Sequence, residues 1–257
     1  MFGMPYECYE QFHVRKYGFH GTSHRFVSMK YGEVTGKSLE GLNIVSCHLG
    51  NGSSITAIKD GKSVDTSMGF TPLDGIIMGT RSGSVDPSAV EFVQNKLGFT
   101  PAQMSDYLNK KSGFLGLSGQ FSDNRDITSA AQQGDKRSQL VTDMLTYEIK
   151  KYIGSYTAAM NGLDVVIFTG GIGENAPEVR KGVCENMEYL GIKLDNSVND
   201  GLKGKLTKIS APDSKVEVWV IPTNEELLIA RDTLEITGLD KNAYCLLYTS
   251  PSPRDAH

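Results

Sequence analysis

The sequence predicts an α/β fold in which a three-stranded antiparallel meander is followed by alternating helices and parallel strands. β-Branched runs separated by tight turns fill residues 43–67. A long segment, about 137–160, carries apolar residues three and four positions apart, which is typical of an amphipathic helix. Two strand–turn–helix units close the chain, and such units require parallel strands joined by right-handed crossovers.

The first elements follow from caps and turns. Thr22 or Ser23 is expected to cap a helix that runs to about Tyr31. The next elements are three short strands, expected at about 43–49, 54–59 and 62–67. Asp60-Gly61 separates the second strand from the third, and this dipeptide is a strong signal for a two-residue hairpin turn.

Helices are expected to fill the middle of the chain. After a loop rich in Gly, Thr and Ser over residues 68–85, Asp86-Pro87 supplies an acidic cap and a proline at the first helical position. Another helix is expected to begin at Pro101. The longest helix has one apolar stripe, formed by Val141, Met144, Leu145, Ile149, Tyr152, Ile153 and Tyr156.

The two closing units share one design. The first has a buried strand at 164–168, a turn at 169–175 and a helix from 176 to about 189. The second has a strand at 216–221 and a helix that ends at about Leu234. Three meandering strands followed by helix, strand, helix, strand and helix are typical of one half of a ribonuclease H-like fold.

Composition excludes several classes of protein. The 257 residues are 39% hydrophobic and 22% charged, which fits a globular protein rather than a disordered one. The net charge is −4, without a basic cluster, which argues against nucleic-acid and membrane partners but leaves anionic small ligands open. The four cysteines lack metal-ligand spacing. With neither a signal peptide nor a long apolar stretch in view, we expect the protein in the cytoplasm.

The stretch HLGNGSS, His48 to Ser54, joins two of the expected strands with more residues than a hairpin needs. Its successive backbone N–H groups could face a phosphate, with the hydroxyl groups of Ser53 and Ser54 beside them. The alternative is a wide hairpin with a bulge.

TGGIGEN, Thr169 to Asn175, lies between a strand and a helix. Its glycines permit close approach of a ligand, and a helix N-terminus there favours negative charge. The glycine spacing differs from the dinucleotide-binding fingerprint. Asn175 with Glu178 could instead be a simple helix cap.

Thr223 and Glu226 have the spacing of a capping box at the start of the last helix. Glu225 between them has no capping role and could hold a hard cation such as Mg²⁺. The alternative for Glu225 is a solvated surface carboxylate.

Arg81, in the small-residue segment MGTRSGS, could reach a phosphoryl or carboxylate group. It could equally be a surface arginine. His20 and His24 in YGFHGTSH lie near a helix start, where they could contact an anion or only cap and pack.

Five long motifs together resemble the acetate kinase family. They are YGFHGTSHRFV, HLGNGSSITAI, DTSMGFTPLDGIIMGTRSGSVDP, FTGGIGEN and IPTNEELLIARDT. They stand in the family's order and at its spacings, and the resemblance extends from about residue 4 to about residue 236. It implies membership of the superfamily shared with sugar kinases, actin and heat-shock chaperones, whose halves are ribonuclease H-like.

The resemblance also implies a reaction and a set of site residues. The reaction is ATP + acetate ⇌ ADP + acetyl phosphate, with Mg²⁺ or Mn²⁺ as cofactor. His20 and Arg81 match the residues that stabilise the phosphoryl transition state, and Glu225 matches the metal-binding glutamate. The loop around the ATP phosphates corresponds to His48, Leu49, Gly50, Asn51 and Gly52. The adenosine-binding segments correspond to Asp123, Asn124 and Arg125 and to Gly171, Ile172, Gly173, Glu174 and Asn175.

The family's first domain has no counterpart here, and we therefore expect a fragment that is inactive alone. Residues 1–16 are expected to be a lead-in from that domain and 17–238 the nucleotide-binding domain. Residues 239–257 are expected to be a non-native tail, with CLLYTSPSPRDAH resembling translated adaptor or vector sequence. The alternatives are a non-catalytic ATP-binding protein and a propionate kinase. The resemblance also implies a homodimer.

Overall fold

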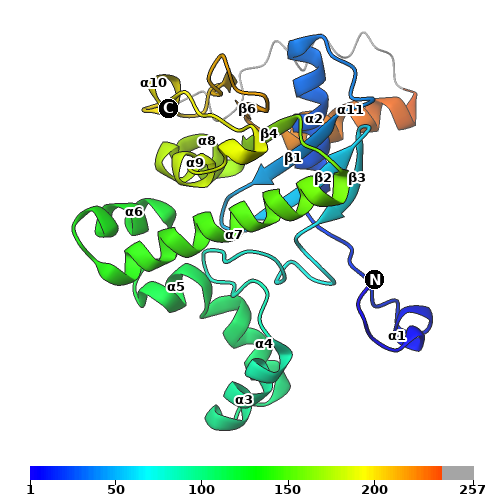
Figure 1. The fold of residues 1–257 in the computed structure, drawn as a ribbon. Helices are drawn as coiled ribbons and strands as arrows, with labels where there is room; N and C mark the ends of the chain where they lie inside the picture. Colours follow the sequence, from blue (N-terminus) through cyan, green and yellow to red (C-terminus); the bar gives the residue numbers. More distant parts are fainter. Residues whose placement is uncertain (239–257) are drawn as a thin grey trace. The chain divides into compact units, whose positions relative to one another are not determined.

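The computed structural model describes residues 1–238, so the expected tail at 239–257 lies outside the described residues. The chain falls into two compact units, residues 1–223 and a second that begins at Asn224. The first unit contains a sheet with strand order β3-β2-β1-β4-β6-β5 (Figure 1). The strands are β1 Asn43–His48, β2 Ser54–Lys59, β3 Lys62–Thr66, β4 Val165–Thr169, β5 Thr207–Lys208 and β6 Glu217–Val220.

The strand directions confirm the predicted α/β fold class. β1, β2 and β3 form an antiparallel meander, whereas β1, β4 and β6 are parallel. The predicted hairpin turn is present, with Asp60 at φ 52° and Gly61 at φ 73°. β5, a two-residue antiparallel edge strand, was not predicted because it is too short to show a sequence period.

The two faces of the sheet are covered by different helices. Side chains alternate along a strand, so neighbouring residues of β1 point to opposite faces. Val45 and Cys47 belong to the core formed with α7 Lys136–Met160 and α9 Pro177–Cys184. Ser46 and His48 instead contact α2 Gly21–Thr35. The serine and histidine of β1 therefore lie on a different face from its apolar core residues.

Helix α7 confirms the predicted apolar stripe. Asp135 caps it by accepting a hydrogen bond from the Ser138 backbone N–H. The stripe residues Val141, Leu145, Ile149, Ile153 and Tyr156 are buried. Met144 and Tyr152 are partly buried and pack against the same core. The helix covers β1 and β2 at the centre of the sheet.

Helix α2 differs from its prediction at both ends. It begins at Gly21 and continues to Thr35, beyond the expected end at Tyr31. The N-cap residue is His20, in the left-handed conformation with φ 62°, and no side chain caps the helix. The expected cap from Thr22 or Ser23 is wrong, because the Ser23 hydroxyl is bonded to His48 across the sheet face.

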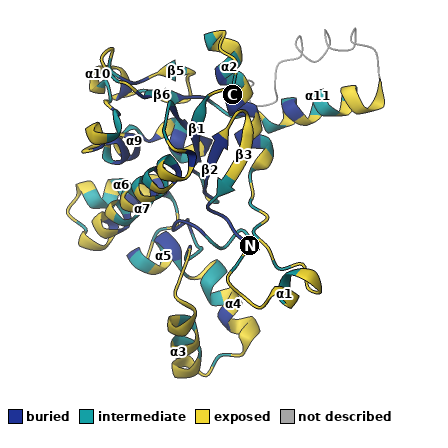
Figure 2. Ribbon diagram, turned by 45° about the vertical axis from the view of Figure 1, so that its right-hand side comes forward, coloured by how far each residue is buried: buried dark blue, intermediate teal, exposed yellow. Residues whose placement is uncertain are grey.

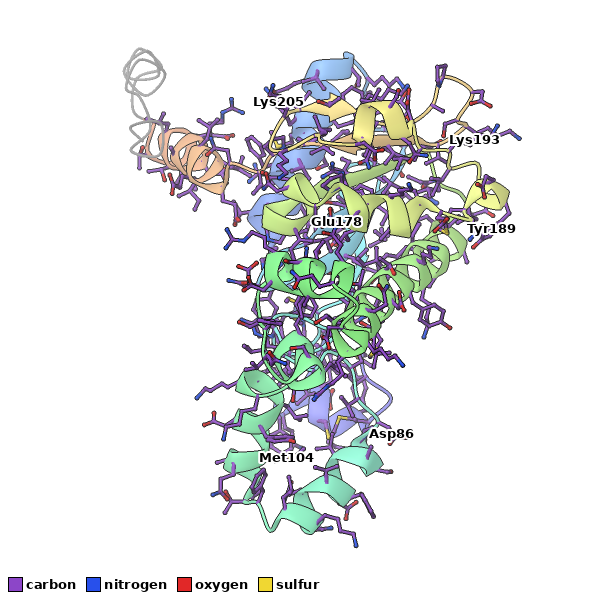
Figure 3. All side chains as sticks on the ribbon, turned by 90° about the vertical axis from the view of Figure 1, so that its left-hand side faces the viewer. Asp86, Met104, Glu178, Tyr189, Lys193 and Lys205 are labelled. Atoms are coloured by element: carbon purple, nitrogen blue, oxygen red, sulfur yellow. The ribbon has the colours of Figure 1, made fainter. Side chains whose placement is uncertain are left out.

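The middle helices begin where predicted. α3 Pro87–Leu97 is capped by Asp86, and α4 Pro101–Lys110 by a capping box of Thr100 and Gln103. Both are mainly exposed (Figure 2). Met104, labelled in Figure 3, is the single buried residue of α4. Apart from the region after β4, four short helices were not predicted: α1 Tyr6–Glu10, α5 Gly113–Ser118, α6 Asn124–Gln132 and α10 Asn196–Asn199.

The region after β4 corrects a second prediction. The expected turn is mostly a short helix, α8 Gly170–Asn175, and the expected helix over 176–189 is two pieces. These are α9 and the 3₁₀ helix η1 Glu188–Leu190. The break between α8 and α9 falls at Ala176, which is non-helical with ψ 84°. The cause is Pro177, which disfavours helical backbone in the residue before it.

The second unit, described from Asn224 to Gly238, contains α11 Glu225–Thr237. The predicted capping box of Thr223 and Glu226 is wrong. Asn224 is the N-cap residue, and its side-chain oxygen accepts a hydrogen bond from the Leu227 backbone N–H. Across the described residues, no helix has both the length and the apolar character that a membrane crossing requires.

Candidate functional site

Two glycine-rich segments meet where β1 and β4 end. Because these strands are parallel, the loop after β1 and helix α8 after β4 lie at the same edge of the sheet. The Leu49 carbonyl accepts hydrogen bonds from the backbone N–H groups of Ile172 and Gly173, at 2.8 and 3.3 Å. Gly170 has φ +76°, and a Cβ there would lie 2.8 Å from the Leu49 carbonyl oxygen. Glycine at this position therefore permits the close contact between the two segments.

A cluster of histidines and serines lies beside this junction, between the first turn of α2 and strands β1 and β2. The His20 and His48 rings stack with centroids 4.0 Å apart and an interplanar angle of 19°. His20 Nδ1 lies 2.9 Å from Ser54 Oγ, and His24 Nε2 lies 2.7 Å from the same oxygen. His48 Nδ1 lies 2.8 Å from Ser23 Oγ.

These contacts correct the role predicted for two serines. Ser54 Oγ is bonded to two histidine rings, and Ser53 Oγ is bonded to the backbone of Gly50 within the loop. Both hydroxyl groups therefore serve the protein's own hydrogen bonding. The candidate phosphate ligands of this loop are its backbone N–H groups.

Burial keeps the three histidines neutral near pH 7. Loss of hydration disfavours the charged ring and lowers the pKa of His24 and of His48 to about 3. Repulsion from neighbouring histidines adds to this effect in both cases. Burial also lowers the pKa of His20, and the positive charge of Arg81 lowers it further. A neutral histidine keeps one N–H group and can donate one hydrogen bond.

Arg81 and His20 converge on Gly52. A Cβ built on Gly52 would lie 3.3 Å from Arg81 Nη1 and 3.4 Å from His20 Nε2. Gly113, at φ +60°, supports the Arg81 segment, because a Cβ there would lie 2.5 Å from the Arg81 carbonyl oxygen. The guanidinium and the imidazole thus meet over a position that lacks a side chain. A guanidinium and an imidazole N–H are suited to binding the oxygens of an anion.

A cavity of about 640 Å³ adjoins the loop after β1. Predicted site residues in its wall are Gly50, Asn51, Asp123, Asn124, Arg125, Gly171, Ile172 and Asn175. Wall residues that the sequence did not suggest are Thr128, Ala176, Pro177, Glu178 and Lys203. Glu178 stands in the first turn of α9 (Figure 3). The cavity has the size of a site for a nucleotide-sized ligand.

Asp123 and Arg125 form one corner of this cavity. Asp123 caps α6 and also binds the Arg125 side chain at 2.7 Å. Hydrogen bonds from Arg125 lower the pKa of Asp123. Because the Arg125 side chain is 89% exposed, this ion pair adds little to stability and leaves Arg125 able to turn toward a ligand.

Comparison with known proteins identifies the family. The model of the acetokinase family matches residues 1–231. The chain belongs to the acetokinase family. It is 56% identical to the acetate kinase of Carboxydothermus hydrogenoformans over 236 residues, and 56% identical to that of Thermotoga maritima over 238. Each alignment covers 92% of this chain and 59% of the relative, so the chain spans about three-fifths of their length.

Solved structures of the acetokinase family agree with this fold. The crystal structure of Porphyromonas gingivalis acetate kinase is similar with a TM-score of 0.90 and 49% identity, over 92% of this chain and 59% of that one. A propionate kinase from Francisella tularensis gives a TM-score of 0.83 and 41% identity, over 89% of this chain and 58% of that one. The expected family resemblance is confirmed.

Some residues matched to acetokinase motifs lie outside the cavity wall. These are His48, Leu49, Gly52, Gly173 and Glu174. The Glu174 carboxylate accepts hydrogen bonds from the backbone N–H groups of Gly170 and Thr223, at 2.9 and 3.2 Å. It joins the ends of β4 and β6 rather than facing the cavity. The alternative cap formed by Asn175 and Glu178 is not present, because Ala176 is the N-cap of α9.

Sequence reasoning did not find Arg180, a fully buried side chain of α9. Arg180 Nη1 donates to the Gly173 carbonyl at 2.9 Å, and Nη2 donates to the Leu202 carbonyl at 2.9 Å. Its Nε donates to Asn199 Oδ1 at 2.8 Å. Arg180 therefore ties α8 to the segment that carries Lys203 in the cavity wall. An arginine within an apolar helix face was the available signal.

Glu225, the expected metal ligand of the acetokinase resemblance, is the first residue of α11. Within residues 1–238 there is no group of three or more His, Cys, Asp or Glu side chains that could hold a metal ion. One carboxylate fits a metal that arrives with a nucleotide, since Mg²⁺ commonly takes one or two carboxylates together with phosphate oxygens and water.

Proposed function

We propose that this chain is the nucleotide-binding part of an enzyme that transfers the γ-phosphoryl group of ATP to acetate, giving ADP and acetyl phosphate. The observation that carries the proposal is the convergence of Arg81 Nη1 and His20 Nε2 over Gly52. The proposal is supported by the adjoining 640 Å³ cavity, which is large enough for the adenosine group. It is also supported by the names of the curated relatives, which are acetate kinases.

The residue types suit this reaction. A carboxylic acid with a pKa near that of a glutamate side chain, about 4.3, is already ionised at pH 7, so acetate needs no general base. The remaining task is to position the reactants and to stabilise the charge on the phosphoryl oxygens in flight. In the proposed site Arg81 supplies a fixed positive charge and His20 supplies a neutral N–H donor. The backbone of His48–Gly52 would bind the nucleotide phosphates.

The proposal includes a divalent cation, Mg²⁺ or Mn²⁺, with Glu225 as its protein ligand. When bound, such a cation neutralises charge on the nucleotide phosphates. Glu225 would hold the cation at one coordination position and would leave the others to phosphate oxygens and water.

Nucleotide binding can be tested on the chain itself by isothermal titration. MgADP is expected to bind to it, and Gly50→Val is expected to weaken binding at least tenfold, because a bulky side chain would occupy the wall of the cavity. Lys62→Ala is the control, since Lys62 lies in the edge strand β3 and outside the cavity wall. Failure of the unaltered chain to bind MgADP would contradict the proposal.

Phosphoryl transfer is best measured with this chain joined to the segment that its longer relatives carry in addition. Hydroxylamine traps acetyl phosphate as a hydroxamate, and the assay is run with acetate, propionate and butyrate. We expect the highest rate with acetate and a loss of roughly 10²–10³-fold in Arg81→Ala or His20→Ala. A higher rate with propionate would favour a propionate kinase, the name of one structural neighbour. Binding of MgADP without transfer to any of the three acids would favour a non-catalytic nucleotide-binding protein.

A homodimer and a cytoplasmic location remain predictions from the resemblance. Light scattering of the purified chain measures the first directly, since a dimer doubles the 28.0 kDa mass of the monomer.

A further inference from the structure

The buried serines around the stacked histidines carry information about where the imidazole protons lie. Ser46 Oγ is 2.9 Å from His24 Nδ1, and His24 Nε2 is 2.7 Å from Ser54 Oγ. Ser54 Oγ is in turn 2.9 Å from His20 Nδ1. These four side chains therefore form one continuous hydrogen-bonded chain that ends at His20.

The direction of the chain follows from its buried end. Ser46 is fully buried, and among residues 1–238 the only hydrogen-bond partner of its hydroxyl is His24 Nδ1. If Ser46 accepted from that nitrogen, its own O–H would be buried without a partner, which is costly. Ser46 therefore donates, and His24 Nδ1 is the unprotonated nitrogen. A neutral imidazole carries one proton, so that of His24 is on Nε2 and is donated to Ser54.

Ser54 then has its own proton to donate. The available acceptors are His20 Nδ1 at 2.9 Å and the Phe19 carbonyl at 3.3 Å. The shorter contact is to His20, and donation there makes Nδ1 the acceptor. The proton of His20 is then on Nε2, the atom that faces the point over Gly52 where Arg81 Nη1 also lies.

The same reasoning applies to His48. Ser23 is fully buried, and within the described part of the chain its hydroxyl is bonded only to His48 Nδ1, at 2.8 Å. Ser23 therefore donates to Nδ1, and the proton of His48 is also on Nε2. The stacked rings of His20 and His48 are thus held in the same tautomer, each by a different serine.

We propose that Ser46, His24 and Ser54 form a relay that fixes His20 as the Nε2–H tautomer, so that it offers an N–H donor to the oxygens of a transferred phosphoryl group. Ser23 fixes the same tautomer in His48. The assignment of the tautomers stands on the hydrogen bonds alone, whereas the phosphoryl ligand rests on the proposed function. Ser46, His24, Ser54 and Ser23 are positioning residues. The other tautomer of His20 would direct a lone pair at the anionic oxygens and repel them.

The test is long-range ¹⁵N–¹H correlation NMR of the ¹⁵N-labelled chain at pH 7.5, which distinguishes protonated from unprotonated ring nitrogens. In the unaltered chain, His20, His24 and His48 are each expected to show a protonated Nε2 and an unprotonated Nδ1. Each alanine variant is then expected to release a particular set of rings, meaning that these rings are no longer held in one tautomer. A released ring is recognised because its two nitrogen shifts move toward each other as both tautomers become populated.

The variants give a pattern that general loosening of the structure would not produce. Ser46→Ala should release His24 and His20, Ser54→Ala should release His20 but leave His24 set by Ser46, and Ser23→Ala should release His48 alone. Ser28→Ala is the matched control, because this buried α2 serine lies one turn after His24 but its hydroxyl donates to the Arg25 carbonyl, and within residues 1–238 it forms no hydrogen bond with a histidine. It should leave all three rings unchanged. Ser46→Thr keeps the hydroxyl and should restore the original spectrum.

A protonated Nδ1 on His20 in the unaltered chain would overturn the proposal, and so would a Ser46→Ala variant that shifts no ring. These measurements need no ligand. A relay confirmed in a chain that fails to bind MgADP would refute the proposed function and leave the tautomer assignment standing.

Discussion

Lowering the pH from 7.5 to 5.5 should destabilise this protein through its buried histidines. The pKa of His24 and of His48 is about 3 in the folded chain, mainly because burial disfavours the charged ring. In the unfolded chain both have the ordinary value of about 6.5. Between these two values the unfolded state binds more protons than the folded state. The stability that these two rings contribute is therefore fully present above about pH 6.5 and is lost as the pH decreases toward 3.

The magnitude follows from the same two values. At pH 5.5, one unit below the ordinary pKa, each unfolded histidine is protonated about ten to one, which weakens the folding equilibrium about tenfold per ring. A tenfold change corresponds to about 1.4 kcal/mol, so the two histidines together lower the free energy of unfolding by roughly 3 kcal/mol. His20 acts in the same direction, since its pKa is also lowered. Glu148 acts in the opposite direction, because burial raises its pKa and its protonation in the folded state is favoured as the pH falls.

A variant isolates the histidine contribution from these other groups. Urea unfolding is followed by fluorescence of Trp219, the only tryptophan, which lies in β6 and contacts Tyr31 of α2. His24→Gln keeps a polar side chain but cannot titrate, so its loss of stability between pH 7.5 and 5.5 should be smaller by about 1.4 kcal/mol. His13→Asn is the control, because His13 is exposed and asparagine tolerates its φ of 55°. An equal loss in His24→Gln and in the unaltered chain would refute this account.

Three further substitutions test the packing around the site. Gly52→Ala should weaken MgADP binding about tenfold or more with little change in unfolding, because the new methyl group would lie 3.3 Å from Arg81 Nη1 and 3.4 Å from His20 Nε2. Arg180→Lys should lower the free energy of unfolding by about 2–4 kcal/mol, since lysine cannot reproduce the fork that binds several buried carbonyl groups. Gly154→Ala should raise the free energy of unfolding by about 0.5–1 kcal/mol, measured by urea unfolding, because a Cβ there meets nothing within 4 Å and alanine favours helix.

The strands and the long helix could be predicted because their sequence periods match their surroundings. The stripe of α7 lies at helical spacing and is buried along its length, and Asp60-Gly61 forms the turn its residues favour. The helix after β4 could not be predicted, since the glycines and the asparagine of Gly170–Asn175 have low helix propensity. There the tertiary contacts decide: the Leu49 carbonyl and the Glu174 carboxylate bind the first N–H groups of α8.

The candidate site, like the fold, could be predicted from the sequence only in part. Motifs identified the loops after β1 and β4, and parallel strands bring such loops together. The motifs did not separate the residues of each loop that line the cavity from those that are bonded to other parts of the protein. Glu174 and Ser54 lie within polar, glycine-containing stretches, yet both are bonded to other parts of the protein. The local sequence around a residue does not indicate which distant element its side chain will contact. Arg180 was missed for this reason.

The histidine cluster nevertheless has a sequence signature that combines two periods. Along α2, His20, Ser23 and His24 stand at spacings of three and four, which places them on one side of the first turn. Along β1, Ser46 and His48 stand two residues apart and therefore face the same side of the sheet. In an ordinary α/β core both sets of positions would be apolar, because a helix face packs against a strand face there. Polar residues at the matching positions of both elements indicate a buried hydrogen-bonded network. Burying these groups is costly unless each has a partner, and a network in which each is satisfied holds its members in one arrangement, as the serines here hold the histidine rings.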